Sequence, residues 1–237
     1  MTATTRWGAR AEELYGDDYA RRYRKHDEAI CRGALVQHFG GWIGELCDRF
    51  ARPIDVLDLG CGTGRYFHAL RSVRSLTGID VSRPMLEQAK HPVDVVTMTA
   101  TPMLIAADFL EHEFDPGQFD LVYSVGVLAE HSPFDAGVAS RVRRWLRAGG
   151  RFAFTAVDPL SFSGPRTYRR RAGEALMPFA RGAWRRGLRE RLMRDGLYAD
   201  EERLREVLTA AGFVVESIEP YDNDVHSHFM TVARNPA

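Results

Sequence analysis

The chain has 237 residues, of which 45% are apolar, and its 32 basic residues balance its 32 acidic residues at a pI near 7.1. This length and apolar content suit one α/β domain with an embellishment. The neutral charge gives no global sign of nucleic-acid binding or of an acidic membrane surface. The three cysteines lack disulfide or metal spacing, and no signal peptide or membrane span is evident. We therefore expect a soluble, cytoplasmic protein.

The residues up to Arg52 read as helical. Leu14, Tyr15, Tyr19 and Tyr23 recur at three- and four-residue spacing, and a second apolar pattern runs from Ile30 to Phe50. The sequence predicts that Gly40-Gly41 breaks or bends this second helix.

The chain is organised around residues 54–65, IDVLDLGCGTGR. A short apolar run of this kind indicates a buried parallel strand. Gly60, Gly62 and Gly64 then allow a turn that a ligand can approach closely. From Tyr66 to Val73 we expect a helix, whose first N–H groups favour an anionic group in the same crevice.

Three kinds of nucleotide loop compete for this stretch. A P-loop requires Gly-Lys-Ser/Thr, whereas Arg65 and Tyr66 follow Gly64. The dinucleotide fingerprint requires its third glycine at position 65, so the Arg65 side chain disfavours NAD or FAD. An acid followed by G-x-G-x-G remains, and a tight turn without any ligand stays as the alternative.

Asp58-Leu59-Gly60-Cys61-Gly62-Thr63-Gly64 resembles the first motif of the class I S-adenosylmethionine (SAM)-dependent methyltransferases. GIDVSRPMLEQA resembles the second motif, and LRAGGRFAFTAV completes a resemblance that covers about residues 55–157. It implies a single Rossmann-like, doubly wound α/β domain. Its sheet would have seven mostly parallel strands with an antiparallel last strand, preceded by N-terminal helices and interrupted by a helical insertion before the last two strands. The implied cofactor is SAM.

A second strand is predicted from Ser75 to Asp80, about twenty residues beyond the glycine turn. A carboxylate at this strand end can accept both hydroxyl protons of a ribose. The alternative is that Asp80 caps the next helix, although Ser82, followed by proline, is the better cap.

A third strand is predicted from Met103 to Asp108, with Val93 to Thr97 as the alternative strand. In the family an acid at this strand end accepts a hydrogen bond from the adenine amino group, and Asp108-Phe109 resembles that pair. The apolar run Phe119 to Ser124 matches the fourth strand, whose end should approach the cofactor from the opposite side.

The resemblance implies a cofactor site that also includes tyrosines of a lid formed by the N-terminal segment; the alternative is that these tyrosines only pack the helix against the core. Asp58 and the glycine backbone would hold the amino-acid end, Asp80 the ribose and Asp108-Phe109 the adenine. The full set is Tyr19, Arg24, Asp58, Gly60, Cys61, Gly62, Gly64, Asp80, Val81, Asp108, Phe109, Ser124 and Val125. Tyr19 or Tyr23 could also stabilise the sulfonium by cation–π attraction.

His131 follows the fourth strand and is the predicted general base for a hydroxyl or a protonated amine. Glu130 is the weaker candidate, and the alternative for His131 is a surface or capping role. His226 and His228 lie two apart but have no evident third ligand, so no metal site is predicted.

The remaining chain is predicted to contain a helix from Val138 to Leu146, ended by Gly149-Gly150, and a strand from Arg151 to Val157. A helix from Ala199 to Gly212, with Asp200 as its N-cap, precedes a hairpin. Its two strands are Phe213 to Ile218 and Phe229 to Arg234.

Residues 158–198 are rich in arginine and amphipathic. We expect a substrate lid whose arginines, such as Arg169, Arg170 and Arg185, could hold an anionic group. A nucleic-acid contact is the disfavoured alternative. A solvated arginine face, with its apolar side on the core or on a second subunit, is favoured for most individual arginines.

One domain, 1–237, is expected, with an N-terminal lid (1–52), a cofactor core (53–157), the insertion (158–198) and a C-terminal helix and hairpin (199–237). The function implied is methyl transfer from SAM to an oxygen or nitrogen of a small molecule, by a monomer or homodimer without nucleic-acid or membrane partners. Two alternatives remain open: a SAM-binding protein without activity, and another enzyme of this fold, such as a polyamine synthase or an NAD-dependent oxidoreductase.

Overall fold

The computed structural model describes residues 5–93, 101–158, 199–222 and 227–236. Three helices come first: α1 (Arg6–Leu14), α2 (Asp17–Ile30) and α3 (Ala34–Asp48). The predicted break at Gly40-Gly41 is wrong, because α3 continues through both glycines. A Cβ on Gly40 would lie 3.5 Å from the Ala69 Cβ. That separation is an ordinary van der Waals contact, so Gly40 neither ends the helix nor is required for its packing.

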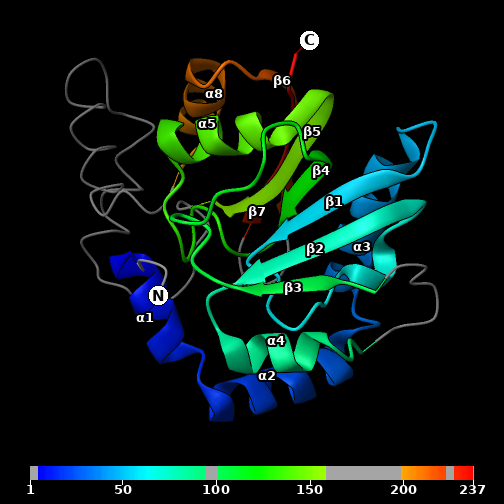
Figure 1. Ribbon diagram of the computed structural model, residues 1–237, viewed down its shortest axis with the longest axis vertical. Coiled ribbons are helices and arrows are strands. Elements are labelled where there is room, and N and C mark those ends of the chain that lie inside the picture. Colours follow the sequence, from blue (N-terminus) through cyan, green and yellow to red (C-terminus); the bar gives the residue numbers. More distant parts are fainter. Residues whose placement is uncertain (1–4, 94–100, 159–198, 223–226, 237) are drawn as a thin grey trace.

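Seven strands form one sheet in the order β3-β2-β1-β4-β5-β7-β6 (Figure 1). All neighbours are parallel except β7, which is antiparallel to both β5 and β6. The strands are β1 (Ile54–Leu59), β2 (Val73–Asp80), β3 (Met103–Ala106), β4 (Phe119–Ser124), β5 (Leu146–Val157), β6 (Val214–Asp222) and β7 (Ser227–Arg234). This sheet confirms the predicted fold class.

Helices cover both faces of the sheet, because alternate side chains of each buried strand point to opposite sides. Leu57 and Leu59 of β1 pack in the core that includes α5 (Ala136–Trp145) and α8 (Glu201–Ala210). Val56 packs in the other core, with side chains of α3 and of α4 (Arg83–Ala89). Figure 1 shows α5 and α8 together on one side of the sheet.

The segment after the glycine turn differs from the prediction. A single 3-10 turn, η1 (Phe67–Ala69), replaces the helix expected from Tyr66 to Val73. The Phe67 side chain is buried and lies so close to Gly64 that a Cβ there would be 2.7 Å from the ring. Leu70 is already extended. The predicted helix start, and with it the anion-binding N–H groups expected there, is therefore wrong.

Gly149-Gly150 does not end a helix either. Helix α5 ends at Trp145, and both glycines lie within β5, where its register with β4 shifts. Gly149 has a φ of +76°, and a Cβ on Gly150 would lie 2.9 Å from the backbone oxygens of Arg147 and Asp120. The two glycines thus allow an irregularity of the strand.

The other predicted elements are present with shifted ends. Strand β3 begins at Met103 and stops at Ala106, two residues short of the predicted end. The alternative strand at Val93 to Thr97 falls largely outside the described residues, as do His226 and the arginine-rich stretch 159–198. Strands β6 and β7 form the predicted hairpin, and Asp200 caps α8 through the Arg203 N–H.

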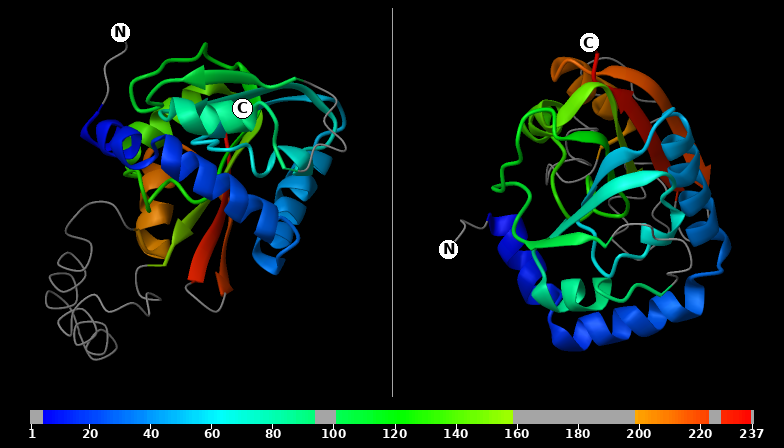
Figure 2. Two further views of the ribbon diagram at one scale, coloured as in Figure 1. Left: turned by 90° about the horizontal axis from the view of Figure 1, so that it is seen from below. Right: turned by 45° about the vertical axis from the view of Figure 1, so that its right-hand side comes forward.

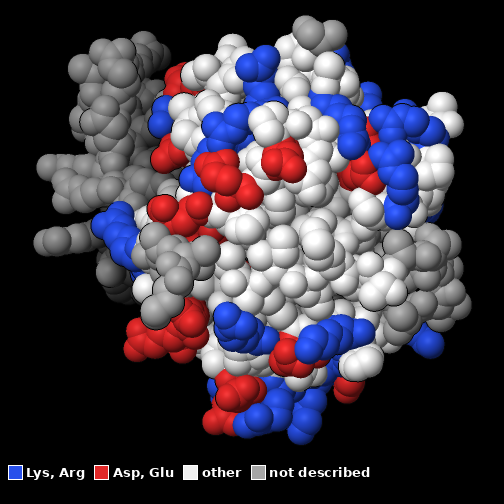
Figure 3. All heavy atoms as spheres, in the orientation of Figure 1, with Lys and Arg blue, Asp and Glu red and all other residues white. Residues whose placement is uncertain are grey.

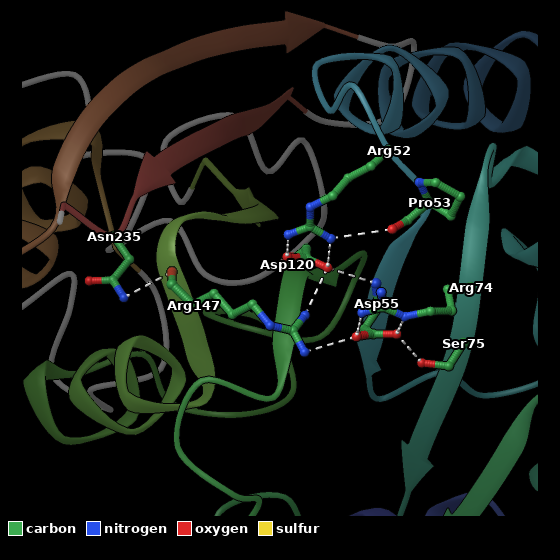
Figure 4. Close-up of polar contacts among 8 residues, drawn as sticks. All are labelled: Arg52, Pro53, Asp55, Arg74, Ser75, Asp120, Arg147 and Asn235. Atoms are coloured by element: carbon green, nitrogen blue, oxygen red, sulfur yellow. Dashed lines mark hydrogen bonds and ion pairs between the residues drawn. The ribbon is translucent and has the colours of Figure 1, made fainter.

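An ion-pair network crosses the sheet at the amino ends of its central strands (Figure 4). Asp120 at the start of β4 pairs with Arg52 and Arg147, and Asp55 in β1 pairs with Arg74 and Arg147. Asp120 also accepts a hydrogen bond from the Asp55 N–H at 2.9 Å. This network lies at the strand ends opposite to the glycine turn and links β1, β2, β4 and β5.

Helices α1 and α2 flank the carboxyl ends of the strands. Helix α2 packs against α4, and α1 continues along the same side of the molecule (Figures 1 and 2). On the face seen in Figure 3, basic and acidic side chains are interspersed around an uncharged centre. Within the described residues, no helix is both long and apolar enough to cross a membrane.

Candidate functional site

A pocket with an empty volume of about 1040 Å³, partly open to solvent, lies beyond the carboxyl ends of β1, β2, β3 and β4. This edge of an open parallel sheet is where such folds bind ligands, at the point where the strand order reverses between β1 and β4. Helices α1 and α2 supply a further wall. The pocket is lined by Trp7, Gly8, Ala11, Tyr15, Tyr19, Tyr23, Asp58, Gly60, Cys61, Gly62, Thr63, Arg65, Tyr66, Asp80, Val81, Met85, Ala107, Asp108, Phe109, Leu110, Val125, Gly126, Val127, His131 and Ser132.

The turn after β1 forms one side of the pocket and depends on glycine. Gly60, Gly62 and Gly64 have φ values of +71°, +53° and +74°, a region that other residues rarely adopt. A Cβ on Gly60 would lie 2.6 Å from the Val127 side chain. The turn therefore exposes main chain to the pocket where side chains would fill the space.

Asp80 joins this turn to the end of β2. Its carboxylate accepts a hydrogen bond from the Gly62 N–H at 2.9 Å and another from the Ser82 N–H at 2.8 Å. Burial raises the pKa of Asp80, while the N–H groups around it oppose that rise. Each carboxylate oxygen keeps acceptor capacity, because two oxygens offer about four lone-pair sites.

Asp58 is the most deeply buried of the three acids and is 4% exposed. Burial raises its pKa to about 8; the nearby Tyr123 hydroxyl opposes the shift, and the charge of Asp80 adds to it. A cationic group beside such a carboxyl favours its charged form and lowers its pKa.

Asp108 faces the start of the chain. One carboxylate oxygen accepts from both the N–H and the hydroxyl of Thr5, at 2.9 and 2.6 Å, and the other accepts from the Leu110 N–H at 2.9 Å. Thr5 in turn caps α1 through the Gly8 N–H. Asp58, Asp80 and Asp108 thus converge on one pocket.

The chain beyond β4 brings His131 to the pocket. The backbone N–H of His131 donates to the Val127 carbonyl at 2.8 Å, which closes a tight turn there. Burial, and then the charge of Arg10, lower the pKa of His131, so the imidazole is neutral at pH 7. Its Nε2 lies 3.5 Å from a carboxylate oxygen of Glu130, whose pKa burial raises to about 7. A neutral imidazole is the form that can accept a proton.

Aromatic side chains of α1 and α2 line the wall opposite the strands. The ring centroids of Tyr15 and Tyr19 are 4.9 Å apart, and those of Tyr19 and Tyr23 are 5.7 Å apart. The Tyr15 ring also meets His131 edge-on, with centroids 6.1 Å apart. Burial is the main reason that the pKa of Tyr15 is raised. Tyr19 and Tyr23 stack face to face, Tyr15 meets Tyr19 edge-on, and all three side chains line the pocket.

Most of the residues singled out from the sequence line this pocket, but three do not. The Arg24 guanidinium donates to the carbonyls of Gln88 and His91, at the end of α4. The Ser124 hydroxyl donates to the Leu59 carbonyl at 2.8 Å. Gly64 stays in the turn but faces the Phe67 ring. These three residues shape the surroundings of the pocket.

Sequence reasoning missed several lining residues. Trp7, Gly8 and Ala11 line the pocket from one face of α1, and Met85 does so from α4. The aromatic and small residues on α1 recur at helical spacing, which is a weak signal. Among the described residues there is no group of three or more His, Cys, Asp or Glu side chains that could hold a metal ion.

Comparisons with known proteins find one family model and several related sequences that match this chain. Residues 56–150 match the family model described as a methyltransferase domain. Malonyl-(acyl-carrier protein) O-methyltransferase of Legionella pneumophila is 29% identical over 154 residues, 62% of this chain and 52% of that protein. Sterol 24-C-methyltransferase of Saccharomyces cerevisiae is 26% identical over 143 residues, 58% of this chain and 33% of that protein. The chain thus spans from a third to about half of the length of these two relatives.

Solved structures share the fold across almost the whole chain. Magnesium protoporphyrin IX methyltransferase from Synechocystis PCC 6803, with bound S-adenosylhomocysteine (SAH), has a TM-score of 0.64 at 16% identity and covers 96% of this chain and 99% of its own. N-methyltransferase NodS from Bradyrhizobium japonicum, also with SAH, has a TM-score of 0.62 at 15% identity, with coverages of 92% and 99%. At these identities the likeness is one of fold.

Proposed function

From the premise that this chain carries a class I SAM-dependent methyltransferase domain, we propose that it transfers the methyl group of SAM to an oxygen or nitrogen of a small molecule. The observation that supports this most directly is the convergence of three acids and a glycine turn on one pocket. Each group suits one part of an adenosyl amino acid. The acceptors of the pocket, which are its acid side chains and the exposed backbone of the turn, fit the ligand's hydroxyl, amino and ammonium donors.

In this proposal, Asp58 and the backbone from Gly60 to Gly62 hold the amino-acid end, Asp80 accepts from the ribose hydroxyls, and Asp108 accepts from the adenine amino group. Phe109 lies directly after Asp108 and offers an apolar border for the adenine ring. When bound, SAM supplies an electrophilic methyl group on a sulfonium.

The protein's remaining tasks are to orient the acceptor, to exclude water and to take up a proton. The stacked rings of Tyr19 and Tyr23 in α2, with Tyr15 at the end of α1, line the pocket and can stabilise positive charge through their ring faces. His131 is the proposed base, since it lines the pocket and its lowered pKa keeps it neutral. Glu130 lies beside His131, and the positive charge of Arg10 helps to lower the pKa of His131.

The test begins with binding. Isothermal titration calorimetry with SAH should give one site per chain, and NADH should not bind. Turnover is then measured with radiolabelled SAM and a panel of small phenols, carboxylates and amines, with SAH release as the signal. Binding of NADH without SAH would refute the cofactor assignment. Binding of SAH without transfer to any acceptor class would favour a non-catalytic SAM-binding protein instead.

A further inference from the structure

Asp27 in α2 contacts the glycine turn directly. Its side chain is 1% exposed. One carboxylate oxygen accepts from the Thr63 hydroxyl, and the other pairs with Arg65, at 2.7 Å from Nε and 2.5 Å from Nη2. Thr63 and Arg65 are residues of the turn that also line the pocket. A carboxylate of the lid helix therefore reaches the loop that follows β1.

The turn has few other side-chain attachments. Its three glycines carry no side chain, and all of them have positive φ. Asp80 accepts from the Gly62 N–H at 2.9 Å. Two carboxylates, one from α2 and one from the end of β2, therefore hold the turn. A glycine-rich loop without such contacts would sample many conformations.

Arg65 connects the turn to the aromatic wall as well. Its guanidinium carbon lies 4.7 Å from the centroid of the Tyr23 ring, within the range of a cation–π contact. Tyr23 stacks on Tyr19, and both tyrosines line the pocket from α2. The same helix therefore carries the pocket-facing tyrosines and the carboxylate that fixes the turn.

We propose that Asp27 is a positioning residue that couples closure of helix α2 over the pocket to the binding-competent shape of the glycine turn. This inference rests on the proposed function, because it assumes that the pocket binds SAM and SAH. Asp27 does not line the pocket. It acts through Thr63 and Arg65, and its contribution to binding is indirect.

Replacement of Asp27 by asparagine tests the role with little change of shape. Every group that faces the Asp27 oxygens is a donor. An amide would point its own NH₂ group at one of them and would leave Arg65 without a charged partner. Because a charge-assisted hydrogen bond is among the stronger contacts that hold the turn, we expect the dissociation constant for SAH to rise about tenfold.

Asp18→Asn is the matched control. Asp18 lies on the same helix, and its side chain, 88% exposed, pairs with Arg21 away from the turn. SAH affinity is measured by calorimetry on wild type, Asp27→Asn and Asp18→Asn well below their unfolding midpoints. Wild type and Asp18→Asn should bind alike. If wild type itself does not bind SAH, the proposed function fails; if wild type and Asp27→Asn bind equally, only the role of Asp27 fails.

Hydrogen exchange gives a readout that a merely structural role would not change. In wild type, SAH should protect amides both in residues 17–30 of α2 and in residues 60–65 of the turn. In Asp27→Asn, protection of the two segments should be weakened together. Protection that persists in both, or a lowered unfolding midpoint with unchanged SAH affinity, would overturn the proposal.

A double-mutant cycle locates the coupling. Arg65→Lys keeps the charge but loses the two-nitrogen contact with Asp27 and the planar stack on Tyr23. If Asp27 acts through Arg65, the dissociation constant of the double variant for SAH should be about the same as that of the single variant that binds SAH more weakly. Fully additive losses would mean that Asp27 and Arg65 act independently and would contradict the proposal.

Discussion

A single carboxylate oxygen of Asp108 accepts both the backbone N–H and the hydroxyl of Thr5, a residue 103 positions earlier in the chain. The acid assigned to the adenine amino group therefore also anchors the first turn of α1. Because Thr5 caps α1 and α1 lines the pocket, adenosine binding and the position of this helix depend on the same side chain.

We predict that Asp108→Asn weakens SAH binding about tenfold or more. An amide must present its NH₂ group either to Thr5 or to the Leu110 N–H, and each lost hydrogen bond to the charged carboxylate contributes about 1.5–3 kcal/mol. Asp115→Asn, an exposed loop acid in the same segment, is the control for calorimetry. Equal affinity of the two variants would argue against adenine recognition by Asp108.

The raised pKa of Asp58 predicts a pH-dependent affinity. Because its pKa is about 8 in the free protein, the ammonium of SAH must displace a proton at lower pH. The dissociation constant should therefore fall as pH rises toward about 8, and calorimetry in buffers of different ionisation enthalpy should detect proton release. Asp58→Asn should bind more weakly and without this slope. A wild-type affinity that is flat across this range would contradict the assignment.

The raised pKa of Asp58 also affects stability. It makes the free energy of unfolding fall as pH rises, which is the opposite of what an ion-paired acid with a lowered pKa does. The folded-state pKa of Asp58, about 8, lies above its unfolded-state value of 3.8, so between these two pH values the folded chain binds a proton that the unfolded chain has released. Its contribution to the free energy of unfolding falls as pH rises through that window. Asp58→Asn should remove this loss, which chemical denaturation at several pH values can measure.

His131→Gln should lower kcat by about 10²–10⁴, the usual contribution of a general base, while SAH affinity stays near that of wild type. Because the pKa of His131 lies below 6.5, the wild-type rate should fall on the acid side of that value, and the variant should lose this limb of the pH profile. His112→Gln is the control, since His112 packs on Phe114. An unchanged kcat in His131→Gln would contradict the assignment of His131 as the general base.

Asp120→Asn should lower the free energy of unfolding by about 1.5–3 kcal/mol, the cost of losing hydrogen bonds to a charged group, because its arginine partners Arg52 and Arg147 stay partly exposed. Asp120 is 2% exposed, whereas the control Asp48→Asn breaks an exposed pair with Arg71 and should cost at most about 1 kcal/mol. SAH affinity should not change in the folded Asp120 variant, because the network lies at the opposite strand ends. Urea denaturation checks the first point and calorimetry the second.

This network also predicts acid sensitivity. The pKa of Asp55 is held low, chiefly by its hydrogen bonds with Arg74, and that of Asp120 is low, despite its burial, because of Arg52 and Arg147. Their contribution is fully present above the unfolded value of 3.8 and is lost as pH falls below it. Wild type should therefore lose stability below pH 3.8, and Asp120→Asn should lose less over the same range.

The sequence by itself determined the cofactor side of the pocket. An apolar run that ends in an acid specifies a buried strand and a carboxylate at its tip, and parallel strands bring such tips to one edge. Asp58, Asp80 and Asp108 could therefore be placed together before any coordinates. Glycine was less informative: Gly60 and Gly62 were interpreted correctly, but Gly40 and Gly149 were not. The same residue can end a helix, allow close packing or permit a positive φ, and only its surroundings decide which.

The tertiary structure decided where the N-terminal helices lie and which side chains they bring to the pocket. Helical periodicity shows which face of a segment is apolar, but it does not show what that face packs against. The contacts of Thr5 with Asp108 and of Asp27 with Arg65 join residues 103 and 38 positions apart, so they form only when the chain is folded. The sequence predicted Arg24 as a residue of the cofactor site, but in the fold its guanidinium donates to the carbonyls of Gln88 and His91 at the end of α4.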